Sequence, residues 1–562
     1  MKIIILGGYG IFGGRLCQLL AQNDRLTMFV AGRSYEAAKK FCARLDSVNP
    51  PIPLAFDRDT TGDDLFEKIH PDLFIDASGP FQNYGTDPYR LAKLCIRYGV
   101  HYMDFADGSE FVNGIRQFDE QAKQRGVFVL SGVSSFPVLT AAVMRHLSPQ
   151  WQAIHSIKAG IAPSPFAVVG MNVIKAIASY AGKPVSLMRN GRPPQGYALT
   201  ESLRYTISPP GRLPLNTLRF SLVDVPDLKV LPTEWPEAET VWMGAGPTPE
   251  ILLRMLNGFA WLVRLRILPS LQFLAPVFYF VINNLRWGEH RGGMFVDIEG
   301  LNQEGNKVHK SWHMVAIGED GPFIPCMALE AAILRMLNGQ TPIPGARAAT
   351  HELELSDYLP LFERRAIYTG VREDLANQPP LPVFRKALGN AWGELPVAIQ
   401  HMHDAPSGSR FTGIAHVQRG KNLLSRLIAA LFRFPDEGKD IPVEVAINKT
   451  GNSETWERNF NGKRFTSHLS NGTGNFSHLL CERFGFFTFG IALVIEEEKL
   501  KYIVRKWRFL NIPLPNCLLP KGECFESSED GQFNFDIEIS YAWIGLIVRY
   551  QGWLRLKAAS NQ

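Results

Sequence analysis

Closely spaced glycines near the N-terminus are the first residues whose types and spacing could do chemistry. Within residues 7–13, the glycines at 8, 10 and 13 fit GxGxxG, and those at 7, 10 and 13 fit GxxGxxG. Such a turn lets backbone amides approach the phosphates of a dinucleotide and lets the next helix pack closely on its strand. An apolar run precedes the turn and helical spacing follows it, which is the context that this motif requires. The predicted phosphate-binding residues are Gly7, Gly8, Gly10, Ile11, Phe12 and Gly13.

A second chemical feature follows the next apolar run, where residues 31–34 read Ala-Gly-Arg-Ser. About twenty residues beyond the last glycine, NAD-specific proteins carry an acidic residue for the ribose 2′-hydroxyl. The guanidinium of Arg33 can instead bind a 2′-phosphate through charge-assisted hydrogen bonds, and Ser34 can add a hydroxyl donor. The sequence therefore favours NADP(H) over NAD(H), the alternative being that Arg33 is only a solvated residue at a strand end. Asp57 could meet the adenine edge or be an ordinary turn residue.

The remaining candidates follow the fourth and fifth apolar runs. Residues 76–81 read Asp-Ala-Ser-Gly-Pro-Phe, and small residues with a proline-locked turn let backbone approach the ribose and nicotinamide. We therefore add Ser78, Gly79 and Pro80 to the cofactor site. Reduction of a carbonyl or imine also needs a proton donor or acceptor beside the nicotinamide. The catalytic candidates, expected on or just beyond the carboxyl ends of strands four and five, are Tyr84, His101 and Asp104.

Alternating strands and helices must position these residues. The apolar runs are 2–6, 26–31, 53–56, 73–77, 102–105 and 127–130, and the segments between them that show helical spacing include 11–20, 35–45 and 91–98. Strands joined by helical crossovers predict a mainly parallel, doubly wound sheet of the Rossmann type, here an α/β domain over residues 1–135.

Four motifs of this domain, taken in order, resemble those of the saccharopine dehydrogenase-like oxidoreductases. They are 7–13 (GGYGIFG), 31–34 (AGRS), 77–81 (ASGPF) with 84–85 (YG), and 99–104 (GVHYMD). Residues 321–330 (GPFIPCMALE) look like the helix with which this family returns to its cofactor domain. The resemblance implies a nicotinamide-dependent oxidoreductase whose middle region, 136–375, forms an α+β domain for substrate binding and oligomerisation. It does not imply saccharopine as the substrate.

Composition narrows the functional classes. A net charge of +5 over 562 residues, with scattered basic residues, predicts no nucleic-acid partner. The seven cysteines lack CxxC spacing, so neither a disulfide framework nor a structural zinc site is indicated, and we expect a cytoplasmic protein. His401 and His403 would share one face of a strand, but with no third ligand assignable we predict no metal site.

The stretch 251–287 is rich in Leu, Phe, Val and Ile, with arginines interspersed and two prolines breaking any long helix. One interpretation is an arginine-flanked surface that contacts a membrane peripherally or admits an apolar substrate. The other, which we favour from the sequence, is a buried helix pair or a homodimer contact. Further on, 292–300 and 310–316 are predicted to form a hairpin of the middle domain.

The last third, 380–562, is predicted to be a separate β-rich α+β domain with antiparallel strands, among them 410–417, 443–447 and 533–539, and a basic helix over 423–434. Its aromatic spacing resembles an uncharacterised domain, DUF4166, found behind saccharopine dehydrogenase-like proteins, which supplies no chemistry. Two functions follow. The first is an NADP(H)-dependent oxidoreductase that transfers hydride to or from a small or lipid-like carbonyl, imine or enone. The alternative is a non-catalytic dinucleotide sensor whose C-terminal domain binds a ligand or partner.

Overall fold

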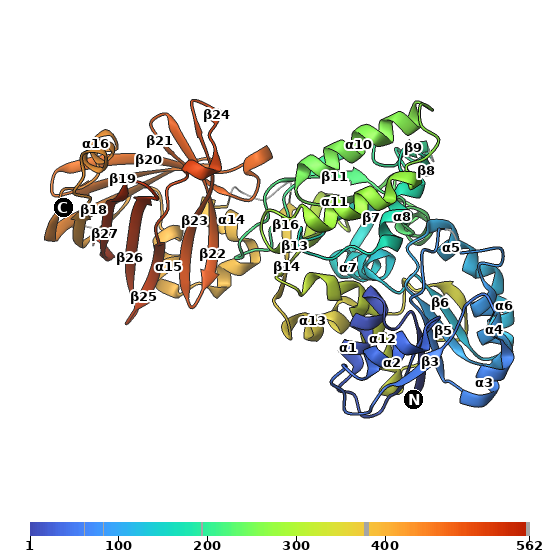
Figure 1. The fold of residues 1–562 in the computed structure, drawn as a ribbon. Coiled ribbons are helices and arrows are strands. Elements are labelled where there is room, and N and C mark those ends of the chain that lie inside the picture. The colour runs from blue at the N-terminus through green and yellow to red at the C-terminus, as the bar shows by residue number, and fades with distance from the viewer. Residues whose placement is uncertain (61, 83, 193–194, 376–380, 558–562) are drawn as a thin grey trace. The chain divides into compact units, whose positions relative to one another are not determined.

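The computed structural model describes residues 1–60, 62–82, 84–192, 195–375 and 381–557. The chain divides into two compact units, coloured along the chain in Figure 1. The first contains Met1–Tyr205 and Leu218–Tyr368, and the second contains Thr206–Thr217 and Thr369–Gln562. The predicted boundaries of three domains, near residues 135 and 380, stay predictions.

The N-terminal sheet is the doubly wound sheet that the alternation predicts. Its strands are β1 (Lys2–Leu6), β2 (Thr27–Gly32), β3 (Ile52–Ala55), β4 (Leu73–Asp76), β5 (His101–Asp104), β6 (Phe128–Ser131) and β15 (Gly345–Ala348). They lie in the order β15-β6-β5-β4-β1-β2-β3, and every pairing is parallel. The helices that accompany them are α1 (Ile11–Leu20), α2 (Tyr35–Cys42), α3 (Asp63–Ile69), α4 (Arg90–Tyr98), α5 (Ser109–Gly114) and α6 (Asp119–Gln124). The strand order reverses beside β1, which is where doubly wound sheets bind ligands.

The middle region returns twice to this first sheet. Helix α12 (Ile324–Leu337) approaches the glycine turn, since the Cys326 thiol donates to the carbonyl of Phe12 at 3.4 Å. Strand β15 then pairs with β6 at the sheet edge. The returning helix was expected from residues 321–330, whereas β15, with the unremarkable sequence Gly-Ala-Arg-Ala, was not.

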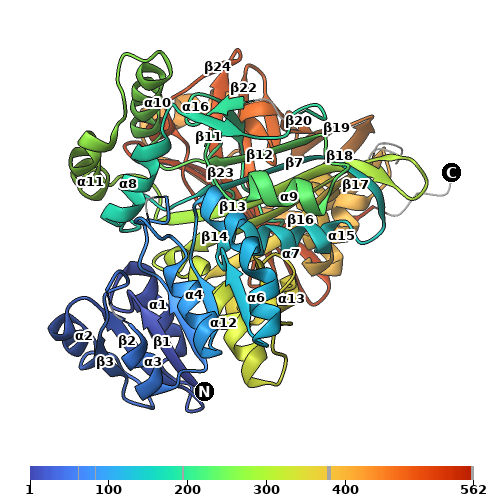
Figure 2. The same cartoon turned by 90° about the vertical axis from the view of Figure 1, so that its right-hand side faces the viewer.

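A second, mixed sheet makes up the core of the middle region, as Figure 2 shows. Its strands include β10 (Ser202–Tyr205), β11 (Leu218–Leu222), β12 (Thr240–Ala245), β7 (Trp151–Ala162), β13 (Arg291–Asn302) and β14 (Lys307–Ile317), in that spatial order. The antiparallel pairing of β13 with β14 confirms the predicted hairpin. The helices of this region are α7 (Thr140–Leu147), α8 (Met171–Tyr180), α9 (Asp227–Glu234), α10 (Glu250–Arg264), α11 (Ala275–Asn284) and α13 (Leu355–Glu363).

Helices α10 and α11 form the stretch that the sequence favoured as a buried helix pair or a homodimer contact. The chain does not bury the pair, and the homodimer contact stays a prediction. Helix α10 buries only Leu253, Ala260 and Val263, and α11 buries only Ala275. The large apolar side chains that stay more than two-fifths exposed are Ile251, Met255, Trp261, Leu265, Ile267, Phe273, Val277, Phe280, Leu285 and Trp287. The α10–α11 hairpin, residues 250–287, therefore presents an apolar surface to solvent. No helix within the described ranges is long and apolar enough to cross a membrane.

The second unit is a single antiparallel sheet that closes on itself. Its strands are β17 (Ser409–Arg419), β18 (Gly438–Thr450), β19 (Ser453–Phe460), β20 (Lys463–Asn471), β21 (Leu480–Phe484), β22 (Phe487–Glu496), β23 (Lys499–Phe509), β24 (Ile512–Pro513), β25 (Cys524–Glu529), β26 (Gln532–Tyr541) and β27 (Gly545–Leu556). Strand β22 pairs with β21 on one side and with β23 on the other, which completes the ring. The β-rich prediction is confirmed.

Three helices accompany this sheet: α14 (Val383–Leu388), α15 (Val397–Asp404) and α16 (Leu423–Leu431). The expectation that His401 and His403 share a strand face is wrong, because both lie in α15. His403 is fully buried and pairs with Glu526 at 2.6 Å. The described part of the chain holds no group of three His, Cys, Asp or Glu residues that could bind a metal ion.

Candidate active site

The glycine turn between β1 and α1 can be formed only by residues without a side chain. Gly7 has φ +76°, and a Cβ there would lie 2.6 Å from the carbonyl oxygen of Ala77. A Cβ on Gly13 would lie 2.3 Å from the carbonyl oxygen of Gly7. Both carbonyl oxygens belong to the backbone, so they cannot move away by a side-chain rotation. The turn therefore brings α1 against β1 as closely as a dinucleotide-binding turn requires.

The N-terminus of α1 is open to a ligand. Gly10 precedes the helix in an extended conformation, is itself exposed, and provides no side chain to accept from the first-turn amides. Uncapped first-turn amides and the helix dipole favour an anion. Gly10 also donates to the Gly7 carbonyl at 2.8 Å, which holds the turn in shape without a ligand. The residues present therefore fit the pyrophosphate of a dinucleotide.

Arg33 and Ser34 follow β2 at the same carboxyl edge of the sheet. Arg33 is exposed, and no hydrogen bond or ion pair involves it in the part of the chain that the structure describes. Ser34 accepts from Ala37 at the start of α2 at 3.2 Å, while its own amide donates to the Tyr9 hydroxyl at 3.1 Å. The Ser34 side chain thus caps α2. At the same edge, Arg33 is a cation for which no described residue provides a partner.

Asp57 lies beyond β3 and accepts from the amide of Asp59 at 3.0 Å. This is the local hydrogen bond of a turn residue, one of the two roles that the sequence left open. Its neighbour Arg58 reaches across the edge instead, donating to the Ser78 carbonyl at 2.9 Å and stacking 4.0 Å from the centre of the Tyr84 ring.

Tyr84 belongs to a buried network at the end of β4. Asp76 is fully buried and accepts from the amide of Ser78 at 2.9 Å and from its hydroxyl at 2.7 Å. The Tyr84 hydroxyl donates to the other carboxylate oxygen of Asp76. Burial first, and then the nearby Asp76 carboxylate, raise the pKa of Tyr84. The Tyr84 hydroxyl therefore helps to hold the loop in place through its hydrogen bonds.

The loop that carries Ser78, Gly79 and Pro80 is tied to the middle region. The amide side chain of Asn172, at the start of α8, donates to the Gly79 carbonyl at 2.7 Å. Phe81 stacks on Tyr84 with 5.0 Å between ring centres. Sequence reasoning missed Asn172, because nothing local marks an asparagine whose partner lies 93 positions away.

Asp104 ends β5 and is a buried structural acceptor. Its carboxylate accepts from Ala106 at 2.9 Å, the Ser131 hydroxyl at 3.0 Å and the Gly132 amide at 2.7 Å. Burial raises the pKa of Asp104 to about 7, against the lowering effect of these hydrogen bonds. Asp104 is the last residue of β5, at the strand end that the sequence predicted. Its hydrogen bonds to Ser131 and Gly132 connect the ends of β5 and β6. Its carboxylate faces protein rather than a cavity.

His101 does not lie where the sequence analysis expected it. It is the first residue of β5, opposite Leu73 at the start of β4, so it occupies the amino edge of the sheet. There its Nδ1 accepts from the amide of Phe128 at 3.2 Å and its ring stacks on Phe128. His101 precedes the apolar run 102–105, so it lies where the strand begins, whereas Asp104 lies where the strand ends.

A cavity of about 610 Å³ opens beside the glycine turn. Ile11 and Phe12 from α1 and Ser135, which follows β6, form its wall toward the first sheet. Its other walls come from the second sheet and from α8, α10 and α11, with residues such as Ile174, Leu256, Phe278, Ile282 and Met294. Of the described residues that line it, only Arg15 is charged. None of Tyr84, His101 and Asp104 is among them.

The cavity reaches the surface on the α10–α11 hairpin. Met255 and Val277 both line it and are 56% and 55% exposed. Arg15 lies near the opposite wall, with its guanidinium 5.9 Å from the centre of the Phe323 ring. Its pKa is lowered by burial. The site is thus an apolar chamber with one end at the carboxyl edge of the Rossmann sheet and the other at an apolar surface.

Comparisons with known proteins match two segments of the chain. Residues 3–130 match the family model described as "Saccharopine dehydrogenase NADP binding domain", and residues 395–554 match "Domain of unknown function (DUF4166)". The chain is thus an oxidoreductase that uses a nicotinamide dinucleotide. More particularly, its N-terminal segment is similar to the saccharopine dehydrogenase family and its C-terminal segment to DUF4166, and the predicted resemblance is confirmed. No curated protein matches the sequence.

Solved structures to which the chain is similar include an apo saccharopine dehydrogenase (L-Glu forming) from Saccharomyces cerevisiae. It is 14% identical, with a TM-score of 0.49, over 66% of this chain and 99% of that one. Another is the WlbA (WbpB) dehydrogenase from Thermus thermophilus in complex with NAD and alpha-ketoglutarate, 11% identical, with a TM-score of 0.28, over 65% of this chain and 99% of that one. These identities are too low to indicate a shared substrate.

Proposed function

We propose that this protein is an NADP(H)-dependent oxidoreductase whose substrate is an apolar, lipid-like carbonyl, imine or enone compound. The observation that carries the proposal is the apolar cavity that begins at Ile11 and Phe12, directly after the glycine turn. A bound dinucleotide supplies or accepts the hydride at the reacting carbon. The chain contributes a chamber that excludes water and has one cation, Arg15, in its wall. A substrate carrying two carboxylates would find no matching set of cations there.

The preference for NADP(H) rests on Arg33. Its exposed guanidinium has no protein partner among the described residues, and it follows β2, the strand end that faces the adenosine ribose in this fold. An unpaired guanidinium can bind a 2′-phosphate bidentately. No described residue that follows β2 before α2 is acidic, so nothing there selects for a 2′-hydroxyl.

The first experiment is a titration of the full chain with NADPH and NADH, following nicotinamide fluorescence, for wild type and Arg33→Ala. We expect Arg33→Ala to weaken NADPH binding about 10- to 100-fold, equivalent to about 1.4–2.7 kcal/mol, and to leave NADH binding unchanged. Arg125→Ala is the matched control, because Arg125 is also exposed but follows α6 on another part of the domain.

Binding of neither dinucleotide would overturn the oxidoreductase proposal. Equal loss of both dinucleotides in Arg33→Ala would overturn the choice of NADP(H). Tight binding without turnover of any imine, enone or long-chain aldehyde would favour the sensor alternative.

We also propose that the α10–α11 hairpin docks on an anionic membrane, from which the substrate enters. The exposed apolar residues of the hairpin are continuous with the cavity mouth at Met255 and Val277. Arg266 and Arg286 are exposed on the same hairpin, and no hydrogen bond or ion pair involves either in the described ranges. Apolar side chains beside unpaired arginines match the interface of a bilayer that carries anionic lipids.

Co-sedimentation with vesicles tests this docking. Wild type should bind vesicles of phosphatidylcholine with phosphatidylserine more than phosphatidylcholine alone, and Phe273→Glu with Phe280→Glu should abolish binding. Ile343→Glu, at a residue that is 73% exposed outside the hairpin, should have no effect. Failure of wild type to bind would overturn the proposal. A dimer in sedimentation that the same double substitution dissociates would assign the surface to a homodimer contact instead.

A further inference from the structure

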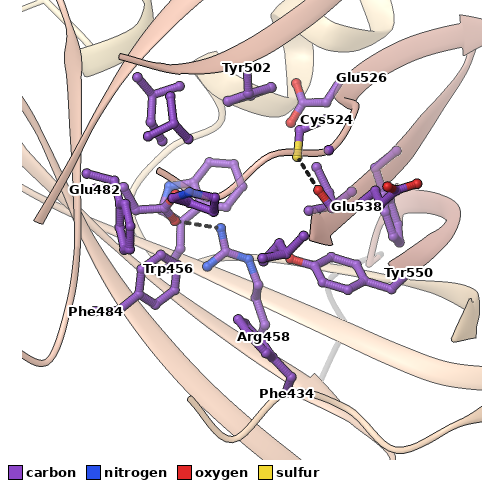
Figure 3. A pocket seen from close by; sticks show the side chains of 18 of the residues that line it. Phe434, Trp456, Arg458, Glu482, Phe484, Tyr502, Cys524, Glu526, Glu538 and Tyr550 are labelled. Atoms are coloured by element: carbon purple, nitrogen blue, oxygen red, sulfur yellow. Dashed lines mark hydrogen bonds and ion pairs between the residues drawn. The ribbon is translucent and has the colours of Figure 1, made fainter. Parts of the chain in front are cut away.

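The closed sheet of the second unit contains a cavity of about 510 Å³ that no known activity uses (Figure 3). Protein interiors are packed as densely as organic crystals, so a space of this size is not an ordinary packing defect. Its volume lies within the range of about 300–1,000 Å³ that is common for pockets of small-molecule ligands. The closed sheet is therefore built around a chamber, as a binding domain would be.

Aromatic and aliphatic side chains form most of the chamber wall. They come from strands on opposite sides of the ring and from α14, α15 and α16, and they include Phe434, Trp456, Phe460, Phe489, Phe533 and Leu554. The chamber opens at the segment 516–522, where Asn516 and Lys521 both line it and are exposed. A ligand of this site must be largely apolar.

An ion pair interrupts the apolar wall. Arg458 on β19 donates to Glu482 on β21 at 3.3 Å and to the Ser467 hydroxyl at 2.8 Å. Both charged side chains are nearly buried, with exposed fractions of 16% and 15%. The guanidinium also lies 5.3 Å from the centre of the Trp456 ring. Figure 3 shows Arg458 and Glu482 joined within the chamber, with Trp456 beside them.

Other charged side chains line the chamber farther from this pair. Glu526 is 8% exposed as a side chain and shares a hydrogen bond of 2.6 Å with Nε2 of the fully buried His403 behind the wall. Lys521 and Glu538, of opposite charge, line the side that opens outward. Breaking a buried pair by giving one partner a new counter-ion leaves the other charge uncompensated, which is strongly unfavourable.

The Arg458–Glu482 ion pair selects against charged ligands. A carboxylate or phosphate that approached Arg458 would be repelled by Glu482, and an ammonium group that approached Glu482 would be repelled by Arg458. A neutral oxygen avoids both costs. The guanidinium has five N–H donors, more than its two recorded acceptors use, and a carboxylate can accept further bonds on its second oxygen. One hydroxyl or carbonyl group could therefore bond to the pair without breaking it.

We propose that the closed sheet is a second ligand site, for a neutral apolar molecule with a single hydroxyl or carbonyl group, such as a long-chain alcohol. The apolar body fills the aromatic chamber and the oxygen bonds to Arg458 and Glu482. This inference is independent of the oxidoreductase chemistry, because every residue that it uses belongs to the second unit.

The test is displacement of the neutral fluorophore N-phenyl-1-naphthylamine from the full chain by 1-dodecanol, dodecanoate or dodecylamine. Wild type should bind 1-dodecanol at least tenfold more tightly than either charged analogue. Val445→Trp, which fills the chamber from β18, should abolish this preference, whereas Asn448→Trp, exposed on the same strand, should not. Leu252→Trp, which fills the cavity of the first unit, should also leave it unchanged.

Glu482→Gln is a second test that does not depend on whether Val445→Trp folds, because it keeps the shape of the side chain and removes only its charge. With Arg458 no longer neutralised, dodecanoate should bind at least tenfold more tightly than it does to wild type, while 1-dodecanol changes little. Dodecanoate binding to wild type as tightly as 1-dodecanol would overturn the proposal. So would a preference for 1-dodecanol that disappears in Leu252→Trp rather than in Val445→Trp.

Discussion

The two cavities described above have similar size and mostly apolar walls, but they differ in the charged groups that those walls contain. The cavity of the first unit, about 610 Å³, has one charged residue among its described lining residues, and it begins beside the glycine turn between β1 and α1. The cavity of the second unit, about 510 Å³, contains its own ion pair, Arg458 with Glu482. In the first, the reactive group must come with the cofactor. In the second, the protein itself supplies the polar contact, which suits binding and not hydride transfer.

A substitution in the glycine turn should separate the two cavities by the largest effect. In Gly13→Ala the new Cβ would lie 2.3 Å from the Gly7 carbonyl oxygen, so backbone must shift where the pyrophosphate binds. We expect NADPH affinity to fall at least 100-fold, about 2.7 kcal/mol, with 1-dodecanol binding in the second unit unchanged.

Gly62→Ala is the control for this substitution, because a Cβ there meets no atom within 4 Å. Fluorescence titration measures both ligands on the same sample. Parallel loss of NADPH and 1-dodecanol binding would show that the two cavities are one functional site and would contradict the comparison.

Buried carboxyl groups make the first unit sensitive to pH. Burial raises the pKa of Asp104 from an unfolded value of 3.8 to about 7. The folded state then binds the proton more tightly than the unfolded state, so stability is greatest at low pH and falls as pH rises from about 4 to 7. We expect unfolding of residues 1–135 to become easier by roughly 2 kcal/mol between pH 5 and 7.5.

Urea unfolding followed by hydrogen exchange in residues 1–135 measures this loss, and Asp104→Asn should reduce it. Asp76 and Asp107, whose pKa values burial also raises, keep part of the slope in that variant. Equal slopes for wild type and Asp104→Asn would show that Asp104 does not titrate in this range.

The sequence predicted the local part of the site well. Strand and helix periodicity placed β1 to β6, and the glycine turn and Arg33 lie at the expected edge, because each depends on residues close together in the chain. The sequence did not predict contacts between residues that are far apart in the chain. Strand β15, Asn172 and the chamber of the closed sheet each join segments far apart in the sequence, and no short-range pattern marks them.

Two expectations failed for different reasons. His101 was assigned to the carboxyl edge although it precedes the apolar run 102–105, and as the first residue of β5 it lies at the amino edge. The apolar composition of α10 and α11 suggested burial, but composition does not say which face of a helix meets a core. Only packing decides that, and here the hairpin keeps Phe280 66% exposed.

A bulky residue in the first cavity tests whether that cavity binds the substrate. Leu252 lines the cavity from α10, and its neighbour Ile251 is 52% exposed and does not. We expect Leu252→Trp to lower kcat/KM for a lipid-like substrate at least tenfold, about 1.4 kcal/mol, because the added ring occupies substrate volume. NADPH binding should stay within about twofold. Ile251→Trp, the matched control, should behave as wild type; similar losses in both variants would place the substrate elsewhere.

Tyr84 should give the smallest effect, and it separates a positioning residue from a catalytic one. Removing its hydroxyl in Tyr84→Phe takes one donor from the buried Asp76 carboxylate, while the Tyr102 hydroxyl remains 3.4 Å from the same oxygen. We expect a loss of stability of about 1 kcal/mol, the lower end for a buried acceptor that loses a partner. The pH profile of kcat should not move, since Tyr84 does not line the cavity. If kcat instead falls more than 100-fold while stability holds, Tyr84 acts on the substrate, and the first cavity has a proton donor of its own.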